Sequence, residues 1–378
     1  MKVLHLISGG DVGGAKVQVL TLVKNLQDKN ISVKIICFAE GIFYEEAKDM
    51  GLDVRLMLQN SRLDMSVLKK LRKIVKEEKF SLVHCHGARA NMIGVLLKRK
   101  INVPIITTMH SDYRLDFKDN FYKRTIFTPI NALSLRFMDH YITISEQLRN
   151  EIIKRGFPAN KISYVFNGLD FENEIRYMDR NKYFMSNDLV YNPDYVYVGI
   201  LARLHPVKGH KVLLRAAKEV LDTNSNVRFL IGGDGAELNN LKKLSTALGL
   251  DSYVYFLGYV DKPYDFLNSI DINLLTSYSE TFPYALLEGA NMKKATISSK
   301  VGGIPKLIID GKTGLLFEPG AYEELAEKMK ILINSEKKRS EMGGELFTWA
   351  KENYSSTKMA EEYIKIYRRV NKDGKGPE

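Results

Sequence analysis

The sequence predicts an α/β protein built from two Rossmann-like domains that face each other across a cleft. Three observations support this fold class: the length, an alternation of short β-branched runs with amphipathic stretches, and a second start of that alternation near residue 195. At 378 residues the chain is longer than one hydrophobic core usually supports. Its 45% hydrophobic and 27% charged residues are ordinary for a globular protein. We therefore expect two domains of one architecture.

The first half of the chain carries the first run of alternating strands and helices. In the segment Met65–Lys79, apolar residues recur three and four positions apart, which is the spacing of one helix face. Strands that alternate with such helices favour a parallel sheet covered on both sides. The predicted strands are Val3–Ile7, Val33–Phe38, Val54–Met57, Leu82–His86, Ile105–Met109, Tyr141–Ile144 and Ile162–Val165, and the predicted helices include Ala15–Gln27, Met65–Lys79 and Glu146–Arg155.

The pattern starts again after a polar, irregular stretch over residues 171–194. Two such blocks in succession indicate two Rossmann-like domains. We place the N-terminal domain at residues 1–185, the C-terminal domain at 186–355, a C-terminal helix that could cross back to the N-domain at 356–370, and a disordered polar tail at 371–378. The predicted strands of the second block are Tyr195–Ala202, Val227–Ile231, Val254–Phe256, Ile272–Leu275, Ala295–Ser298 and Leu315–Phe317.

Positive charge is concentrated in the first half of the chain. Residues 1–185 hold 30 Lys and Arg against 20 Asp and Glu, a net charge of +10, whereas the remaining residues hold 26 against 25. This asymmetry suggests an acidic partner for the first half: an anionic membrane surface, a phosphate-bearing molecule or nucleic acid. General solubility is the alternative. Aromatic residues are not interleaved with the basic runs, which argues against single-stranded nucleic acid.

Two basic amphipathic segments are candidates for docking on a membrane surface. Lys69–Lys76 places cations beside an apolar face, and Phe121–Arg136 combines aromatic and basic residues. Each could equally be a helix packed into the fold. No apolar run reaches the roughly 20 residues that span a bilayer, and the N-terminus has no signal-peptide pattern. With only two cysteines, Cys37 and Cys85, the sequence predicts a cytoplasmic protein that could lie on the inner face of a membrane.

The segment Glu280–Glu288 closely follows the predicted strand Ile272–Leu275, at the end where open α/β sheets bind ligands. Pro283 suits the first turn of a helix, whose free backbone N–H groups attract phosphate. A carboxylate on each side, however, would repel a bare anion. Glu280 and Glu288 fit better as hydrogen-bond acceptors for the hydroxyls of a sugar and a ribose. The alternative is a helix-terminus carboxylate at Glu280 and a solvated one at Glu288.

Arg203 and Lys208 follow the predicted strand Tyr195–Ala202 in a loop that also contains Pro206 and Gly209. Two cations at the carboxyl end of a strand can neutralise a diphosphate and the charge that builds up as it leaves. Arg offers a planar fork of donors, whereas Lys acts as a point charge. Solvated surface cations are the alternative.

Two glycine-rich loops also follow predicted strands. Residues 9–14 lack the Gly-Lys-[Ser/Thr] ending of a Walker loop and the register of G-x-G-x-x-G, so neither that loop nor a nicotinamide site is expected. Gly232–Gly235 could bring the backbone close to a nucleotide. Either loop could instead be a tight turn.

The run His84-Cys85-His86 resembles a metal cluster at first sight. On a strand, however, the two histidines share one face and the cysteine points to the other. Two histidines without carboxylates are a poor metal site, and the chain has no Asp-x-Asp pair to hold a metal against a diphosphate. We therefore expect no metal. His86 ends one predicted strand and His110 directly follows another, and we expect both to face the cleft; a structural role is the alternative.

As an ordered series, these residues resemble glycosyltransferase family 4, enzymes of the GT-B fold, over nearly the whole chain. The matching positions are Gly13-Gly14, Thr108-Met109-His110, Arg203 with Lys208, Gly233-Asp234-Gly235, Glu280 with Glu288, Val301–Pro305 and Gly311–Gly314.

The resemblance implies retaining transfer of a hexose or N-acetylhexosamine from a UDP- or GDP-sugar to a glycan, a glycolipid or a cell-surface polymer precursor. It implies no cofactor, no catalytic metal and no nucleic acid partner. His110 and Glu280 would be the catalytic residues, and the departing phosphate would deprotonate the acceptor. The implied donor site has Gly14, Arg203 and Lys208 at the diphosphate, Glu288 at the ribose, Gly235 and Val260 at the base, and Glu280 with the backbone amides of Thr281, Phe282 and Pro283 at the sugar.

Two positions depart from the family pattern and leave specificity open. Lys16 stands where the family often has an acidic residue, and Lys306 where it usually has Glu. Lys16 and His86 are candidates on the acceptor side, for a glycan or lipid-linked acceptor. The alternatives are a sugar-nucleotide epimerase of the GT-B fold and a non-catalytic basic protein that binds membrane or nucleic acid.

Overall fold

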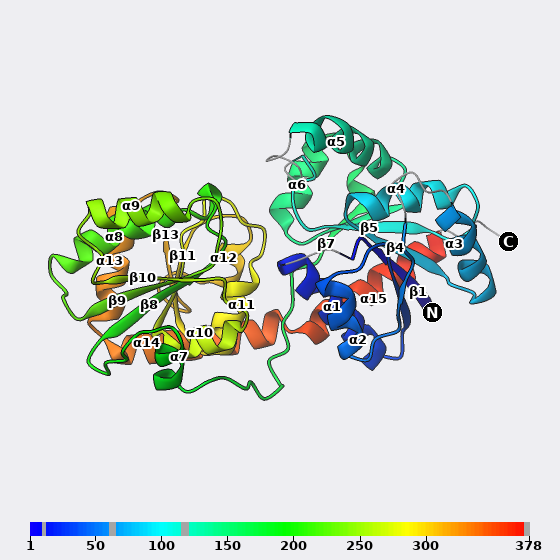
Figure 1. The fold of residues 1–378 in the computed structure, drawn as a ribbon. Coiled ribbons are helices and arrows are strands. Elements are labelled where there is room, and N and C mark those ends of the chain that lie inside the picture. Colours follow the sequence, from blue (N-terminus) through cyan, green and yellow to red (C-terminus); the bar gives the residue numbers. More distant parts are fainter. Residues whose placement is uncertain (10–12, 60–65, 115–120, 374–378) are drawn as a thin grey trace. The chain divides into compact units, whose positions relative to one another are not determined.

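The computed structural model describes residues 1–9, 13–59, 66–114 and 121–373, which form two compact units (Figure 1). Unit 1 comprises Met1–Gly168 and the segment from Ser356 onward, and unit 2 comprises Leu169–Ser355. Each unit contains one parallel sheet with helices on both faces. The predicted α/β class with two Rossmann-like domains is therefore confirmed.

The sheet of unit 1 has seven strands in the order β3-β2-β1-β4-β5-β6-β7. The chain moves outward from β1 to β3 and returns to the other side of β1 with β4, so the strand order reverses between β1 and β4. Ligands of such sheets bind at this reversal, beyond the carboxyl ends of the strands. The elements are β1 Lys2–Ile7, α1 Gly14–Asp28, β2 Ser32–Cys37, α2 Ile42–Asp49, β3 Val54–Leu56, α3 Ser66–Glu77, β4 Leu82–His86, α4 Gly87–Lys98, β5 Ile105–Met109, α5 Phe121–Leu135, β6 His140–Thr143, α6 Glu146–Lys154, β7 Ile162–Tyr164 and α15 Ser356–Asp373.

The two faces of this sheet are buried under different helices. Helices α1, α2 and α15 cover one face, where Val19, Phe43 and Tyr363 join one core. Helices α3, α4 and α6 cover the other, where Leu71 and Ile93 join a second core. The inner strands are almost entirely buried on both sides, which explains why most of their residues are apolar, whereas the edge strands β3 and β7 are partly exposed.

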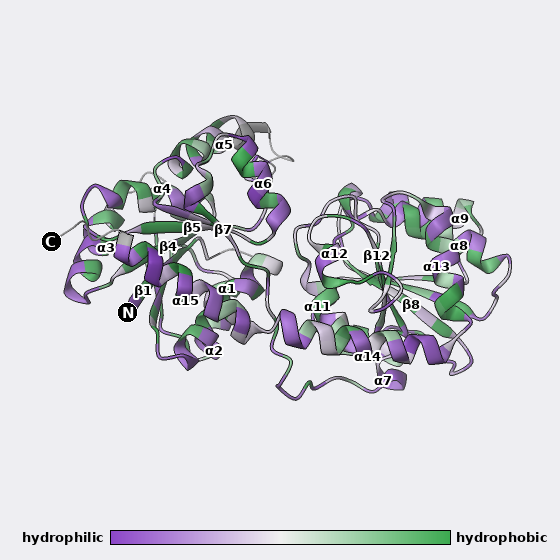
Figure 2. Ribbon diagram, turned by 180° about the vertical axis from the view of Figure 1, so that it is seen from behind, coloured by the Kyte–Doolittle hydropathy of each residue, from purple (hydrophilic) through white to green (hydrophobic). Residues whose placement is uncertain are grey.

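The sheet of unit 2 has six strands in the order β10-β9-β8-β11-β12-β13, and its reversal lies between β8 and β11. Figure 2 shows these strands as hydrophobic and the surrounding helices as mixed. The elements are α7 Arg180–Ser186, β8 Val196–Leu201, the 3-10 helix η2 Pro206–Lys208, α8 His210–Leu221, β9 Val227–Gly232, α9 Leu238–Ala247, β10 Val254–Gly258, α10 Pro263–Ser269, β11 Ile272–Leu275, α11 Tyr284–Asn291, β12 Ala295–Ser299, α12 Ile304–Leu307, β13 Leu315–Phe317, α13 Tyr322–Ile333 and α14 Glu336–Asn353.

The units divide earlier than residue 185, where we placed the end of the first domain. Contacts of α7 explain the difference, because this helix is anchored to unit 2. The backbone N–H of Met178 donates to Asp265 Oδ1 at 2.7 Å, and Arg180 forms an ion pair with Asp271 at 3.0 Å. The polar stretch before β8 therefore belongs to unit 2.

The C-terminal helix α15 belongs to unit 1. Gln18 Nε2 of α1 donates to Tyr363 Oη at 2.9 Å, and Tyr367 Oη lies 2.7 Å from His84 Nδ1. The helix runs to Asp373, so the first residues of the predicted tail are helical, and residues 374–378 lie outside the described part of the chain. Among the helices described, none combines the length and apolar composition needed to cross a membrane.

Candidate active site

The candidate site of unit 2 lies at the reversal between β8 and β11, where two loops are tied together. Thr276 Oγ1, after β11, donates to the carbonyl oxygen of Lys208 at 2.8 Å. The backbone N–H of Tyr278 donates to the carbonyl oxygen of Val207 at 2.7 Å. The loops after the two strands therefore form one structure at the carboxyl edge of the sheet.

An ion pair joins the two loops. Lys208 Nζ lies 2.5 Å from Glu280 Oε1, and Ser277 Oγ donates to the same oxygen at 2.6 Å. The two charged side chains are only 17% and 10% exposed, so salt screens them less than a surface pair. An ammonium has three donors, so Lys208 is held in place with donors left for an anion. The sequence placed both residues at the site but carried no signal of their pairing or of Ser277.

Glycines allow the loops to approach each other. Gly209 has φ +67°, and a Cβ there would lie 2.1 Å from the carbonyl oxygen of Thr276. Gly302, after β12, has φ +58°, and a Cβ there would lie 1.9 Å from the carbonyl oxygen of Glu280. Any side chain at either position would push the loop away, so these glycines fix where the Glu280 carboxylate lies.

Arg203 follows β8 and is exposed. No hydrogen bond or ion pair joins its guanidinium to any residue that the structure describes. A guanidinium without a protein partner at the carboxyl edge of a sheet can bind phosphate oxygens with two donors. Arg203 and Lys208 thus provide two cations on one loop, and Lys208 is already paired with Glu280.

Glu288 lies on α11 and is half-buried. Burial raises the pKa of its carboxyl group to about 7. Burial, and then the charge of Glu288, raise the pKa of Tyr264 on α10 to about 12, so the two side chains are neighbours. Within the described residues no donor hydrogen-bonds to the Glu288 carboxylate. A poorly hydrated carboxylate gains stability from hydroxyl donors, such as those of a ribose.

The remaining residues of the predicted sugar site are Thr281, Phe282 and Pro283. Phe282 is 1% exposed and its ring packs on Tyr354, with centroids 4.9 Å apart, so its side chain belongs to the core. Pro283 is the N-cap of α11. Because proline has no backbone N–H, the expected amide contact from Pro283 is wrong. Thr281 is half-buried, and its carbonyl oxygen accepts from the backbone N–H of Gly303 at 2.7 Å.

The residues predicted to lie near the nucleotide base of the donor, Gly235 and Val260, also make contacts within the protein. The backbone N–H of Gly235 donates to Asp234 Oδ1 at 2.7 Å. The Val260 side chain packs beside Phe266 at the end of β9, where a Cβ on Gly232 would lie 2.9 Å from it. Contacts of Gly235 and Val260 with a base stay predictions.

In unit 1, buried histidines form a network on β1 and β4. His5 Nδ1 lies 3.0 Å from His86 Nε2, and His84 Nε2 lies 2.8 Å from Thr108 Oγ1. Burial lowers the pKa of His5 to about 3 and holds those of His84 and His86 well below their usual range, so all three are neutral at pH 7. His86 is 2% exposed, and its role on the acceptor side stays a prediction. The sequence pattern missed His5, which pairs with His84 in the β1–β4 register.

The network comes closer to a metal site than His84 and His86 suggested. Nitrogen atoms of His5, His84 and His86 lie within 4.8 Å of one another. Both nitrogens of His84 are already bonded, to Tyr367 and Thr108, so a metal ion would have to displace these partners. Cys85 lies in the core on the opposite face, as the strand pattern predicted. The absence of a metal from the reaction stays a prediction.

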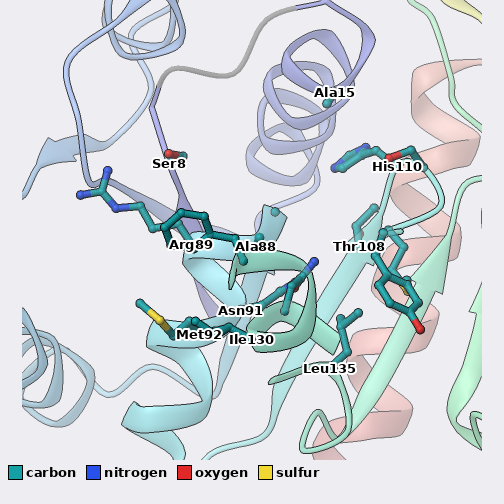
Figure 3. Close-up of a pocket in the computed structure, with 16 residues that line it drawn as sticks. Ser8, Ala15, Ala88, Arg89, Asn91, Met92, Thr108, His110, Ile130 and Leu135 are labelled. Carbon is teal, nitrogen blue, oxygen red and sulfur yellow. The ribbon is translucent and has the colours of Figure 1, made fainter. Parts of the chain in front are cut away.

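His110 follows β5 and lines a cavity of about 320 Å³ in unit 1 (Figure 3). Figure 3 shows His110 and Ala15 at one end of this cavity and Leu135 at the other. Burial lowers the pKa of His110 to about 4, so its imidazole is neutral at pH 7. A neutral imidazole at a cavity wall can hydrogen-bond a hydroxyl, but it is a poor proton source.

The loop after β1 is described only in part, because residues 10–12 lie outside the described residues. Gly14 is the exposed first residue of α1. Lys16, two residues further, forms an ion pair with Glu46 of α2. The acceptor-side role predicted for Lys16 would therefore compete with an internal partner.

Comparisons with known proteins cover both units. A family model described as "Glycosyltransferase Family 4" matches residues 12–173, and one described as "Glycosyl transferases group 1" matches residues 182–345.

Individual proteins match over nearly the full length. The chain is 27% identical to an uncharacterised glycosyltransferase of Methanocaldococcus jannaschii, over 90% of this chain and 92% of that protein. It is 24% identical to the capsular polysaccharide biosynthesis glycosyltransferase CapM of Staphylococcus aureus, over 94% of each. The crystal structure of Anabaena HepE in complex with UDP matches with a TM-score of 0.82 at 21% identity, over 98% of this chain and all of that one, and HepE has also been solved with UDP-glucose.

Proposed function

Because the chain belongs to glycosyltransferase family 4, we propose that it is a retaining glycosyltransferase that needs no catalytic metal. Its donor would be a UDP- or GDP-sugar carrying a hexose or N-acetylhexosamine. The observation that carries this proposal is the set of charged residues on the loops and helix after β8 and β11: Arg203, which has no partner among the described residues, Lys208 held by Glu280, and a poorly hydrated Glu288 on α11. The UDP complexes of HepE support a nucleotide sugar as the donor.

Arg203 and Lys208 would bind the diphosphate and stabilise the negative charge that grows on it as the bond to the sugar breaks. Two cations can supply the neutralisation for which other enzymes use a metal ion. The ion pair with Glu280 fixes the Lys208 ammonium, so little rearrangement is needed as charge develops. The other carboxylate oxygen of Glu280 would accept from a sugar hydroxyl.

Glu288 would accept hydrogen bonds from the ribose hydroxyls, since a carboxylate makes stronger hydrogen bonds than a neutral acceptor. The acceptor hydroxyl would lose its proton to the departing phosphate. His110, neutral at pH 7, would position a sugar hydroxyl rather than transfer a proton. His110→Ala should then slow transfer more than it weakens donor binding.

The acceptor is proposed from chemistry and from relatives. CapM is named for capsular polysaccharide biosynthesis, and a second relative, WclY of Escherichia coli, for O-antigen biosynthesis. We therefore propose a growing glycan, a glycolipid or another polymer precursor as the acceptor.

The experiment that tests this proposal has two steps. Thermal unfolding with UDP, GDP and their sugars identifies the donor, because a ligand that binds only the folded state raises the melting temperature. NMR of the product then compares the anomeric configurations of donor and product, with and without EDTA. We expect the same configuration in both and no effect of EDTA. An inverted product, or activity abolished by EDTA and restored by a divalent metal, would contradict the proposal.

A further inference from the structure

The outer face of α5 and the residues just after it carry exposed apolar side chains. These residues are Ile126, Ile130, Leu133 and Phe137, which are 38%, 38%, 62% and 49% exposed. Their spacings of four, three and four residues place them on one side of the helix, and we call them the apolar stripe. The opposite side of α5 packs on α4, where Asn131 and Leu135 are buried (Figure 1). Contiguous exposed apolar surface of this kind marks an interaction site.

A basic pocket lies beside one end of the apolar stripe. Lys98, the last residue of α4, donates to the carbonyl oxygen of Phe137 at 2.9 Å. The next residues of the chain enter a pocket of about 360 Å³ between α3 and α4. Four exposed cations line it: Arg72, Lys76, Arg99 and Lys100. None of these four forms an ion pair with any residue in the described ranges.

This surface is distinct from the predicted active-site edge of unit 1. Helices α3 and α4 end just before β4 and β5 begin, so the basic pocket lies at the amino edge of the sheet. His110 and its cavity lie at the carboxyl edge. Helix α5 runs from the carboxyl edge to the amino edge, because it connects the end of β5 to the start of β6. The apolar stripe thus extends from the cavity, which Ile130 also lines, to the basic pocket.

We propose that the apolar stripe and the basic pocket dock unit 1 on an anionic lipid bilayer. The stripe would enter the interface between headgroups and acyl chains, and the four cations would bind lipid phosphates. Nucleic acid would satisfy the cations but leave the stripe uncovered. A second copy packed on the stripe would cover the apolar side chains but leave the four cations without an anionic partner.

Docking has a consequence for the substrate, and this step rests on the proposed function. Since Ile130 belongs to both the stripe and the cavity of His110, a docked protein would hold that cavity close to the membrane surface. A lipid-linked acceptor would then reach the cavity with its lipid still in the bilayer.

Vesicle co-sedimentation of the full chain tests the docking surface. The vesicles contain phosphatidylcholine alone or mixed with phosphatidylglycerol. We expect binding to the mixed vesicles only, weakened by salt. Each cation near an anionic surface contributes about fivefold to the partition constant, so Arg72→Glu with Lys76→Glu should lower binding by about 30-fold or more. Leu133→Ser with Phe137→Ser should lower it as well.

Matched controls lie in unit 2. Lys242→Glu with Lys243→Glu makes the same change of charge on exposed residues of α9, and Met185→Ser with Val190→Ser removes side chains that are 74% and 90% exposed. Both controls should bind the vesicles as the wild type does. The thermal shift produced by UDP or GDP should be unchanged in all four double variants, which shows that they are folded.

Several results would overturn the docking proposal. One is a wild type that does not sediment with the mixed vesicles, and another is docking variants that sediment as well as the wild type. A concentration-dependent dimer that Leu133→Ser dissociates, without vesicle binding, would assign the stripe to a second copy. Failure of the proposed function is distinguishable, because it would leave vesicle binding intact while no nucleotide shifted the melting temperature.

Discussion

Acid should weaken unit 1 far more than unit 2, because unit 1 buries most of the histidines. His5, His84 and His86 are neutral and fully buried, and their pKa values lie well below the 6.5 of an unfolded chain. As the pH falls below 6.5, the unfolded chain takes up protons that the folded unit does not bind. The stability that these histidines contribute is complete above pH 6.5 and is lost as the pH falls toward the folded pKa, about 3 for His5.

The size of the effect follows from this linkage. Each such histidine lowers the free energy of unfolding of unit 1 by about 1.4 kcal/mol per pH unit below 6.5, or by about 2 kcal/mol between pH 7 and pH 5. The three together cost about 6 kcal/mol, comparable with the whole stability of many domains. Burial also lowers the pKa values of His110 and His140 to about 4, so both add to the loss in unit 1.

Unit 2 should respond differently. Burial lowers the pKa of His210 to about 4, which destabilises unit 2 in acid. Burial raises the pKa of Glu288 to about 7, and a raised carboxyl pKa stabilises the folded state as the pH falls. Each effect amounts to about 2 kcal/mol between pH 7 and pH 5, so they nearly cancel.

Urea unfolding at pH 7 and pH 5 measures the two units separately. The single tryptophan, Trp349, lies on α14 and reports on unit 2, whereas far-ultraviolet circular dichroism reports on both. In His5→Asn, the amide replaces Nδ1 and can keep the bond to His86 without titrating. This variant should reduce the acid-induced loss in unit 1 by about 2 kcal/mol. His205→Asn, in unit 2, should leave that loss unchanged. An acid-insensitive dichroism transition, or His5→Asn with the wild-type loss, would refute this reasoning.

Three substitutions in unit 2 test the site and its support. Lys208→Ala should weaken binding of UDP or GDP about tenfold or more by calorimetry. Because it leaves the Glu280 charge without its partner, it should also destabilise unit 2, and adding Glu280→Gln should restore that stability but not the affinity for the nucleotide. Phe282→Ala should destabilise unit 2 by about 3–5 kcal/mol in urea followed by tryptophan fluorescence, since it empties a core position; a small effect would contradict its burial. Gly302→Ala should displace the Glu280 loop and lower nucleotide affinity, whereas Gly344→Ala, with no atom within 4 Å of its new methyl group, should not.

The strands and the edge that carries the site were predictable because their signals are local. Leu82–His86, Ile105–Met109 and Ile272–Leu275 are buried on both faces, and each was predicted with the observed bounds. Once a parallel sheet is assigned, the ends of its strands share an edge, which places Arg203 and Glu280 near each other.

The side-chain contacts of the site depend on segments that lie far apart in the sequence, and local sequence patterns do not encode such contacts. The Lys208–Glu280 ion pair forms because Gly209 and Gly302, which have no Cβ, allow the backbones of three loops to pack closely together. The burial of Phe282 depends on Tyr354, the residue after α14, and no sequence pattern near Phe282 indicates this contact.

The division between the units was missed for a similar reason. The contacts that fix α7 to unit 2 join Met178 and Arg180 to residues almost a hundred positions later. A polar composition indicates a connection between domains, but not which domain the connection packs on.

Glu288 is proposed to hold the ribose of a nucleotide sugar, and a comparison of two ligands tests this role most directly. Calorimetry would measure UDP and 2′-deoxy-UDP, or the guanine pair if GDP binds better, against the wild type and Glu288→Ala. We expect the wild type to prefer the ribonucleotide by about tenfold, as one hydrogen bond to a charged group allows. Glu288→Ala should bind both weakly and without preference. A preference that persists undiminished in Glu288→Ala would contradict the claim.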